Sequence, residues 1–186
     1  MKVYISMIRG INVSGQKKIR MADLKSLYES LNFQNVRTYI QSGNVIFEYT
    51  DTNLSILAKI VEEKILHTFD FHVTVFMRTI EDLKKIAKNN PFLNDRKEDI
   101  NKLHVTFLSH KPNQSSIDEI VNYECKPDEF YLNCKEIYLF CPNGYGRTKL
   151  SNNFFESKLN LSATTRNWKT INKLIDIAST TSSNNI

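Results

Sequence analysis

The first half of the chain alternates between two spacings of hydrophobic residues. Short runs rich in apolar, β-branched and aromatic residues are typical of strands, whereas apolar residues three or four positions apart are typical of helices. The strand pattern occurs at residues 2–8, 36–40, 45–49 and 72–77, and the helix pattern occurs at 21–31 and 54–65. The predicted order is therefore β-α-β-β-α-β, the order of the ferredoxin-like fold.

The second half repeats much of this order. Thr79-Ile80-Glu81-Asp82 has the pattern of a capping box opening a linking helix, which must end near Asn90 because Pro91 disfavours helix at the preceding residue. Further strands are predicted at 103–108, 130–132 and 137–140, and further helices begin near 116 and 165. The last helix, with Thr164 or Thr165 as its N-cap, is expected to carry Arg166 in its first turn and to bury Trp168.

We therefore predict an α+β protein made of two ferredoxin-like subdomains with antiparallel sheets, packed together. The boundary is expected near residue 80, giving an N-terminal subdomain over 1–80 and a C-terminal α+β subdomain over 81–186. The Ser-, Thr- and Asn-rich tail at 179–186 is expected to be flexible.

Composition narrows the class of protein. The chain has 186 residues, of which 41% are hydrophobic and 24% charged, as is usual for globular proteins. Its longest apolar runs fall short of the roughly 20 residues that span a bilayer, and residues 1–8 are too short for a signal peptide. A cytoplasmic protein without a membrane segment is therefore expected.

Cysteine and histidine usage argues against a disulfide framework and against a metal site. The cysteines are odd in number, and the histidines lack zinc-ligand spacing. These residues are Cys125, Cys134 and Cys141, and His67, His72, His104 and His110. No cofactor and no catalytic triad are predicted.

Polar, basic loops are the main functional feature. In a βαββαβ unit, the end of the first strand, the hairpin between the second and third strands, and the start of the fourth strand share one edge of the sheet. That topology brings together the loop at 9–18 and the turn at 41–44, with His72 nearby. The start of the first helix also lies there, and a helix N-terminus attracts anions.

The loop resembles a P-loop only in its glycines. Gly10 and Gly15 have P-loop spacing, but Gln16 and Lys17 replace the required Lys and Ser or Thr, so an NTPase is excluded. The net charge of +5 favours acidic partners, although a solvated lysine-rich surface gives the same count. The candidate ligand-binding residues are Arg9, Asn12, Ser14, Lys17, Lys18, Ser42, Asn44, Arg147, Lys149, Arg166 and Asn167.

Several motifs together resemble the DUF1697 family of bacterial α+β proteins. They are Arg9–Val13, Tyr39–Phe47, Asn90–Phe92, Leu103–Leu108 and Thr165–Thr170. The resemblance runs from about residue 3 to about residue 178, and it departs at Ser14, where the family often has Gly. It implies two ferredoxin-like subdomains and brings no established activity.

Three functions fit these observations. The leading hypothesis is binding of a phosphate-bearing or other anionic ligand, including nucleic acid, at the basic loops. The second is an enzyme for a small anionic substrate, with His72 as a proton-transfer group. Its substrate would be oriented by Asn12, Ser42, Asn44 and Arg166. The third is a protein-interaction module, in which the polar segments serve the fold and an apolar patch lies elsewhere.

Overall fold

The computed structural model describes residues 1–13 and 15–182. The chain divides into two compact units, unit 1 with Met1–Lys85 and Lys173–Ile186, and unit 2 with Ile86–Asn172. Helix α3 (Ile80–Lys88) begins in unit 1 and ends in unit 2, whereas α7 (Trp168–Ser182) begins in unit 2 and ends in unit 1. A division at residue 80 stays a prediction.

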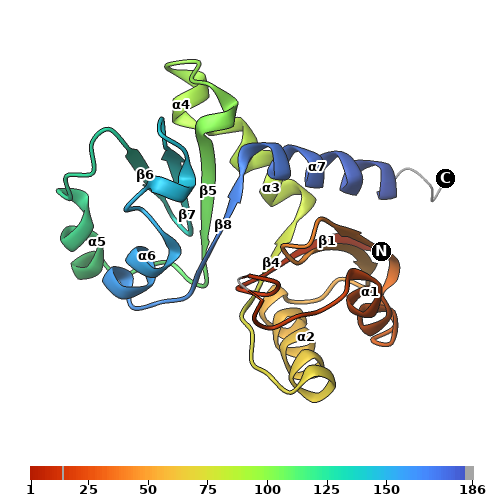
Figure 1. Ribbon diagram of the computed structural model, residues 1–186. Helices are drawn as coiled ribbons and strands as arrows, with labels where there is room; N and C mark the ends of the chain where they lie inside the picture. Colours follow the sequence, from red (N-terminus) through yellow and green to blue (C-terminus); the bar gives the residue numbers. More distant parts are fainter. Residues whose placement is uncertain (14, 183–186) are drawn as a thin grey trace. The chain divides into compact units, whose positions relative to one another are not determined.

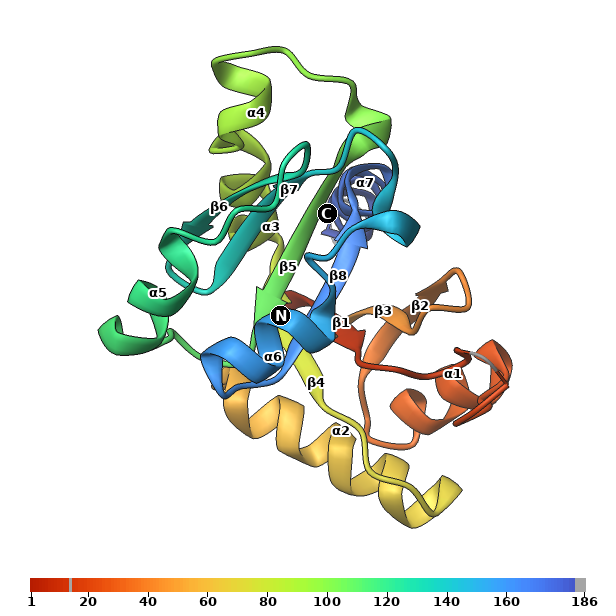
Figure 2. The same ribbon diagram turned by 60° about the vertical axis from the view of Figure 1, so that its left-hand side comes forward.

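Unit 1 contains a four-stranded antiparallel sheet with strand order β2-β3-β1-β4. Two helices, α1 and α2, pack on one of its faces (Figures 1 and 2). The elements are β1 (Lys2–Ile8), α1 (Met21–Glu29), β2 (Gln34–Tyr39), β3 (Asn44–Tyr49), α2 (Leu54–Phe69) and β4 (Val75–Thr79). The predicted βαββαβ order is confirmed, although β4 begins at Val75 rather than at residue 72, because its pairing with β1 begins where Val75 faces Ile8.

Unit 2 contains a second four-stranded antiparallel sheet, with the equivalent order β6-β7-β5-β8. Its elements are α4 (Pro91–Asn94), η1 (Ile100–Lys102), β5 (Leu103–Leu108), α5 (Gln114–Val121), β6 (Glu129–Asn133), β7 (Glu136–Phe140), η2 (Tyr145–Arg147), α6 (Asn152–Leu159) and β8 (Ala163–Asn167). The predicted α+β class with two ferredoxin-like sheets is confirmed.

Strand β8 corrects the prediction of a helix that begins at residue 165. Thr165 faces Thr106 of β5, and Arg166 lies in the strand with 7% of its surface exposed. The helix begins at Trp168 because the Asn167 side chain accepts a hydrogen bond from the Thr170 N–H at 2.7 Å. Sequence favoured a helix here because Thr and Asn are common N-caps, although Thr, unlike Asn, is also frequent in strands.

Helix α7 extends further than its apolar spacing predicted. Trp168 is buried, as predicted, together with Ile171 and Leu174. The helix continues to Ser182. Thr181 is almost fully buried and its hydroxyl donates to the Ile177 carbonyl at 2.9 Å. Residues 183–186 of the predicted flexible tail lie outside the described residues.

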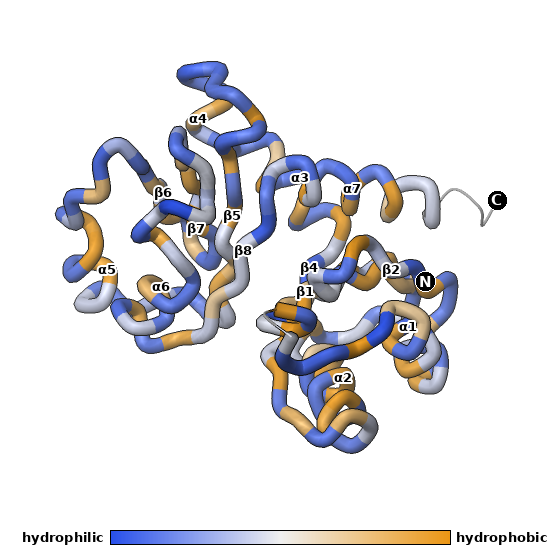
Figure 3. The backbone as a smooth tube through the Cα atoms, viewed as in Figure 1, coloured by the Kyte–Doolittle hydropathy of each residue, from blue (hydrophilic) through white to orange (hydrophobic). Residues whose placement is uncertain are grey.

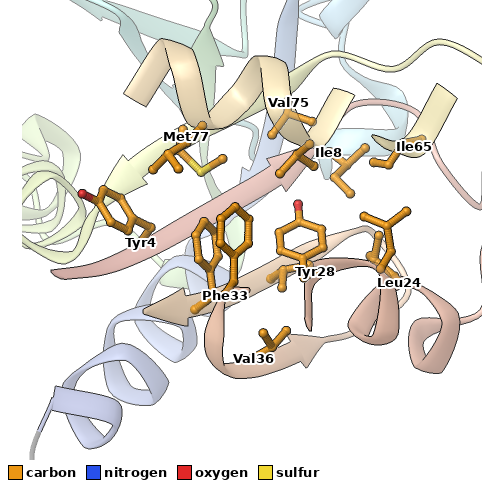
Figure 4. Close-up of a cluster of buried hydrophobic side chains, with 14 of the residues drawn as sticks. Tyr4, Ile8, Leu24, Tyr28, Phe33, Val36, Ile65, Val75 and Met77 are labelled. Carbon is orange, nitrogen blue, oxygen red and sulfur yellow. The ribbon is translucent and has the colours of Figure 1, made fainter. Parts of the chain in front are cut away.

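The core of unit 1 lies between the sheet and helices α1 and α2. Apolar residues recur along both helices (Figure 3), and Figure 4 shows Leu24, Tyr28 and Ile65 meeting Ile8 of β1. The Tyr28 hydroxyl shares a buried 2.7 Å hydrogen bond with Ser6, and burial raises the pKa of Tyr28. This core fixes β1 and α1, and with them the two ends of the basic loop.

Helices long and apolar enough to span a membrane are absent from residues 1–13 and 15–182.

Candidate functional site

Three segments meet at one edge of the unit 1 sheet, as the topology predicts. The Ile8 N–H donates to the Gly43 carbonyl at 2.8 Å, which joins the end of β1 to the 41–44 turn. The Arg9 N–H donates to the Thr74 carbonyl at 2.9 Å, which joins the same strand end to the residues before β4. The loop from β1 to α1 therefore leaves the sheet beside both other segments.

Asn12 holds this loop in place. Its amide nitrogen donates to the carbonyls of Ile19 and Gln41 at 2.9 and 3.0 Å, and its amide oxygen accepts from the Ile19 N–H at 2.9 Å. Asn12 also has a positive φ of 56°, a conformation that Asn tolerates better than most residues. The predicted contact residue is thus engaged within the fold, where it ties the loop to the hairpin turn.

The two lysines of the loop differ in their surroundings. The Lys17 ammonium donates to the His72 carbonyl at 2.7 Å and lies 5.9 Å from the centre of the Phe71 ring. Lys18 is exposed, and no hydrogen bond or ion pair joins its ammonium to another described residue. Lys18 therefore carries a positive charge that can still meet an anion.

Ser42 and Asn44 stabilise the hairpin turn. The Asn44 amide donates to the Tyr39 carbonyl at 3.1 Å and to the Ser42 hydroxyl at 3.0 Å, and Asn44 is fully buried. Between them, Gly43 has a φ of +75°, and a Cβ there would lie 2.7 Å from the Ile11 side chain. The turn consequently packs tightly against the start of the basic loop.

Helix α1 begins at this edge, and the side chain of its N-cap residue, Arg20, makes no capping hydrogen bond with a described residue. The residue before the helix, Arg20, instead pairs with Asp23, with Nε–Oδ2 at 2.8 Å and Nη2–Oδ1 at 3.0 Å. Its guanidinium holds the pKa of the Asp23 carboxyl below the usual value. The first N–H groups of α1 therefore face the loop without a hydroxyl or amide acceptor from the N-cap position.

An open cavity of about 450 Å³ lies at this place. Its lining combines loop, helix start and turn: Asn12, Gly15, Lys18, Ile19, Arg20, Met21 and Gln41. Five lining residues were not among the predicted site residues: Gly15, Ile19, Arg20, Met21 and Gln41. In the sequence, Met21 belongs to the apolar face of the helix predicted at 21–31, and Gln41 belongs to the turn between two predicted strands. Of the remaining loop candidates, Arg9 is half-buried and Ser14 lies outside the described residues.

The four C-terminal candidates lie in unit 2. Arg147, the last residue of η2, and Lys149, between η2 and α6, are both exposed. Arg166 is buried in β8, where its Nη1 donates to the Thr164 hydroxyl at 2.8 Å and the Thr165 carbonyl at 3.0 Å. Asn167 caps α7.

Sequence reasoning missed a polar cluster in unit 2. The Thr165 hydroxyl bonds to Tyr145 at 3.1 Å, to Thr106 at 2.7 Å and to Asn152 at 2.7 Å. The His104 ring stacks on Tyr145 with centroids 4.9 Å apart, and its buried Nδ1 has no hydrogen-bond partner among the described residues. Burial lowers the pKa of His104, while the Lys102 carbonyl opposes that shift. The alternation of His104 and Thr106 along β5 was the available signal.

The comparisons with known proteins agree with this fold. A solved structure with the same architecture is that of the conserved bacterial protein SP0830 from Streptococcus pneumoniae. It is 24% identical, with a TM-score of 0.73, and the match covers 95% of this chain and 98% of that chain. Curated proteins give no match. Residues 1–138 match the family described as protein of unknown function (DUF1697). The chain therefore belongs to the DUF1697 family.

Proposed function

We propose that the unit 1 edge binds a phosphate-bearing or other anionic ligand. The observation that carries this proposal is the cavity of about 450 Å³ between the basic loop, the hairpin turn and the start of α1. A cavity of this volume suits a small molecule or one or two nucleotides rather than a protein surface.

The charge distribution supports an anion. The Lys18 ammonium at the cavity is free of described partners, whereas Arg20 is shared with Asp23. The first N–H groups of α1 add partial positive charge at the same place, because a helix N-terminus carries the positive end of the helix dipole. We assign the first ligand contacts to Lys18 and the start of α1, with Lys17 as the neighbouring cation.

The same geometry gives less support to the enzyme hypothesis. The amide groups of Asn12 and Asn44 are engaged by backbone carbonyls, and Arg166 belongs to unit 2. His72 is exposed, and the contact that joins it to the loop uses its carbonyl rather than its imidazole. The ligand-binding function needs none of these groups to perform proton transfer.

Titration calorimetry with pyrophosphate, ATP and a short oligothymidylate, at low and high salt, tests the proposal. Lys18→Gln should weaken binding of the preferred anion about tenfold, since a charge-assisted hydrogen bond contributes roughly 1.5–3 kcal/mol. Replacing Arg9, Lys17 and Lys18 together should also flatten the salt dependence. The matched control is Lys25→Gln, an exposed lysine on α1 that pairs with Glu29 at 3.7 Å.

The outcomes separate the ligand classes. Binding that strengthens with oligonucleotide length and falls steeply with salt identifies nucleic acid. Tight binding of ATP or pyrophosphate with a shallow salt dependence identifies a small ligand. Equal affinities for the parent protein, the triple variant and Lys25→Gln would show that the basic loop does not contribute to ligand binding.

A further inference from the structure

The cavity at the unit 1 edge has an apolar wall as well as positive charges. Ile19 and the half-buried Met21 line it with apolar side chains, and its charged lining residues are Lys18 and Arg20. An ammonium and a guanidinium hold a phosphate through charge-assisted hydrogen bonds, for which an apolar wall is not needed. A ligand that matches the whole lining therefore has an apolar part in addition to its anionic part.

The net charge at the cavity is positive. Carboxylates are absent from its described lining residues. Arg20 pairs with Asp23, so these two side chains together contribute no net charge. Lys18 adds one positive charge, and its ammonium has no partner among the described residues. A Cβ at Gly15 would lie 3.9 Å from Lys18 Cε, so the lysine side chain extends past Gly15, which also lines the cavity.

The hydrogen-bonding capacity of the cavity is concentrated in one side chain. Asn12 lines the cavity, but its amide is already bonded to the backbones of Ile19 and Gln41. Gln41 is exposed, and its side-chain amide has no hydrogen bond with a described residue. An amide presents a donor and an acceptor side by side, and this combination pairs with the edge of a nucleobase.

The turn fixes the backbone of Gln41 and leaves its side chain able to move. Ile40, the preceding residue, has a φ of 50°, in a left-handed conformation that β-branched residues rarely adopt. The Asn12 amide donates to the Gln41 carbonyl at 3.0 Å, which ties the turn to the basic loop. Surrounding contacts of this kind hold strained residues in place, commonly at binding sites. Gln41 is thus positioned at the cavity before a ligand arrives.

We propose that the ligand of this site is a free mononucleotide, with its phosphate beside Lys18, its base against Met21 and the edge of the base paired with the Gln41 amide. This inference rests on the anion-binding function proposed above and adds the class of ligand. The cavity volume of about 450 Å³ lies within the range of about 300–1,000 Å³ that is usual for small-molecule sites.

The lining distinguishes a nucleotide from other phosphate esters. A nucleobase has apolar faces and a hydrogen-bonding edge, so an apolar wall and one available amide match it. A phosphosugar would place hydroxyl groups against the apolar wall, which costs free energy because they lose their hydrogen bonds to water. An alkyl phosphate would cover the Gln41 amide without pairing it.

Titration calorimetry compares probes that each carry one phosphate monoester: AMP, UMP, ribose 5-phosphate and hexyl phosphate. At least one of the two nucleotides should bind about tenfold more tightly than ribose 5-phosphate, because its base removes apolar surface from water. The same nucleotide should bind about threefold more tightly than hexyl phosphate, because its base also pairs with Gln41.

Three variants separate the parts of the site. Gln41→Leu should abolish the preference for the nucleotide over hexyl phosphate and leave the affinity for ribose 5-phosphate unchanged. Met21→Gln should weaken binding of the nucleotide and of hexyl phosphate, whereas Lys18→Gln should weaken binding of all the probes equally. The matched control is Gln34→Leu, at an exposed glutamine that begins β2, the end of that strand remote from the turn.

Thermal unfolding checks that each variant is folded. Because Gln41 is exposed, Gln41→Leu tests the inference even if Met21→Gln fails to fold.

The outcomes separate this inference from the proposed function. Nucleotides that bind no more tightly than ribose 5-phosphate, or a nucleotide preference that survives Gln41→Leu, would overturn the inference, while weaker binding of every probe by Lys18→Gln would still support anion binding. Absence of binding by all the probes would overturn both. An affinity that rises further from AMP to a tetranucleotide of adenylate would overturn the free mononucleotide as the occupant.

Discussion

Units 1 and 2 have the same strand order but differ in the connection from the first strand to the first helix. In unit 1 this connection covers residues 9–20 and contains Lys17 and Lys18, whereas in unit 2 it covers only 109–113. Both begin at the same edge of equivalent sheets. The comparison shows that the candidate anion site arises from a lengthened loop on a shared scaffold, which is where proteins commonly place binding residues.

The same comparison extends to how the first helix begins. Asn113 caps α5 through a 2.8 Å hydrogen bond from the Ser116 N–H, whereas the side chain of Arg20, at the N-cap of α1, makes no capping bond with a described residue. The last strands of the two units, β4 and β8, resemble each other more closely. Arg78 of β4 faces Ile5, Arg166 of β8 faces Val105, and both arginines are buried on their strands. The repeat is thus retained at the last strand and altered at the first loop.

Substitutions in the two hydrophobic cores should have the largest effects and show whether units 1 and 2 unfold independently. Phe47 packs against Phe33 and Tyr28 in unit 1, with ring centroids 4.3 and 5.5 Å away, and Phe155 packs against Phe130 at 5.9 Å in unit 2. Phe47→Ala and Phe155→Ala should each lower the free energy of unfolding by about 3–5 kcal/mol.

Hydrogen exchange resolved by peptide distinguishes local from global effects. Because the two core clusters have no residue in common, Phe47→Ala should deprotect β1 and β3, and Phe155→Ala should deprotect β5 and β7. Equal deprotection of both sheets by either variant would show that the units unfold together.

Two glycines with positive φ, Gly43 in unit 1 and Gly144 in unit 2, allow the packing of a turn to be compared between the units. Gly43 and Gly144 both have positive φ, of 75° and 87°, but a Cβ would clash with Ile11 at Gly43 and meet nothing within 4 Å at Gly144. Gly144→Ala should cost about 1 kcal/mol of stability from backbone strain, and Gly43→Ala about 2–3 kcal/mol because overpacking adds to the strain. Urea denaturation measures both. Similar costs would mean that Ile11 moves aside.

Substitutions at the N-caps of α5 and α1 should change stability less than the core and glycine substitutions. Asn113→Ala should lower the free energy of unfolding by about 1 kcal/mol, the usual cost of losing an N-cap. Arg20→Asn should have the opposite effect on α1, raising the melting temperature slightly while weakening anion binding, since the new cap competes for the same N–H groups. Calorimetric melting and anion titration of both variants test this. Unchanged anion affinity in Arg20→Asn would mean that the start of α1 does not contact the ligand.

The smallest expected effect is a pH dependence confined to unit 2. Burial lowers the pKa of His104 in the folded state, so the unfolded chain binds the proton more readily. The free energy of unfolding should therefore be highest above pH 6.5, the ordinary pKa of histidine, and should fall as the pH drops below that value. His104→Phe should flatten that part of the curve. A parallel decline in His104→Phe would assign the loss to other groups.

The sequence by itself determined the secondary structure of unit 1, the α+β class and the grouping of the first loop with the hairpin turn. These follow from local spacing and from the topology of a βαββαβ unit, in which β1, the hairpin and β4 share an edge. The sequence did not reveal β8, because Thr164 and Thr165 suit either an N-cap or a strand. Pairing with β5 and burial of Arg166 decide for the strand.

The tertiary structure alone decided the role of each side chain. Asn12 and Asn44 have the composition of ligand contacts, yet backbone carbonyls of the loop and turn occupy their amides. Lys17 is tied to His72, and Lys18 remains available. A sequence specifies which groups can form hydrogen bonds, but their partners depend on distances set by segments far apart in the chain, and those distances exist only in the folded protein.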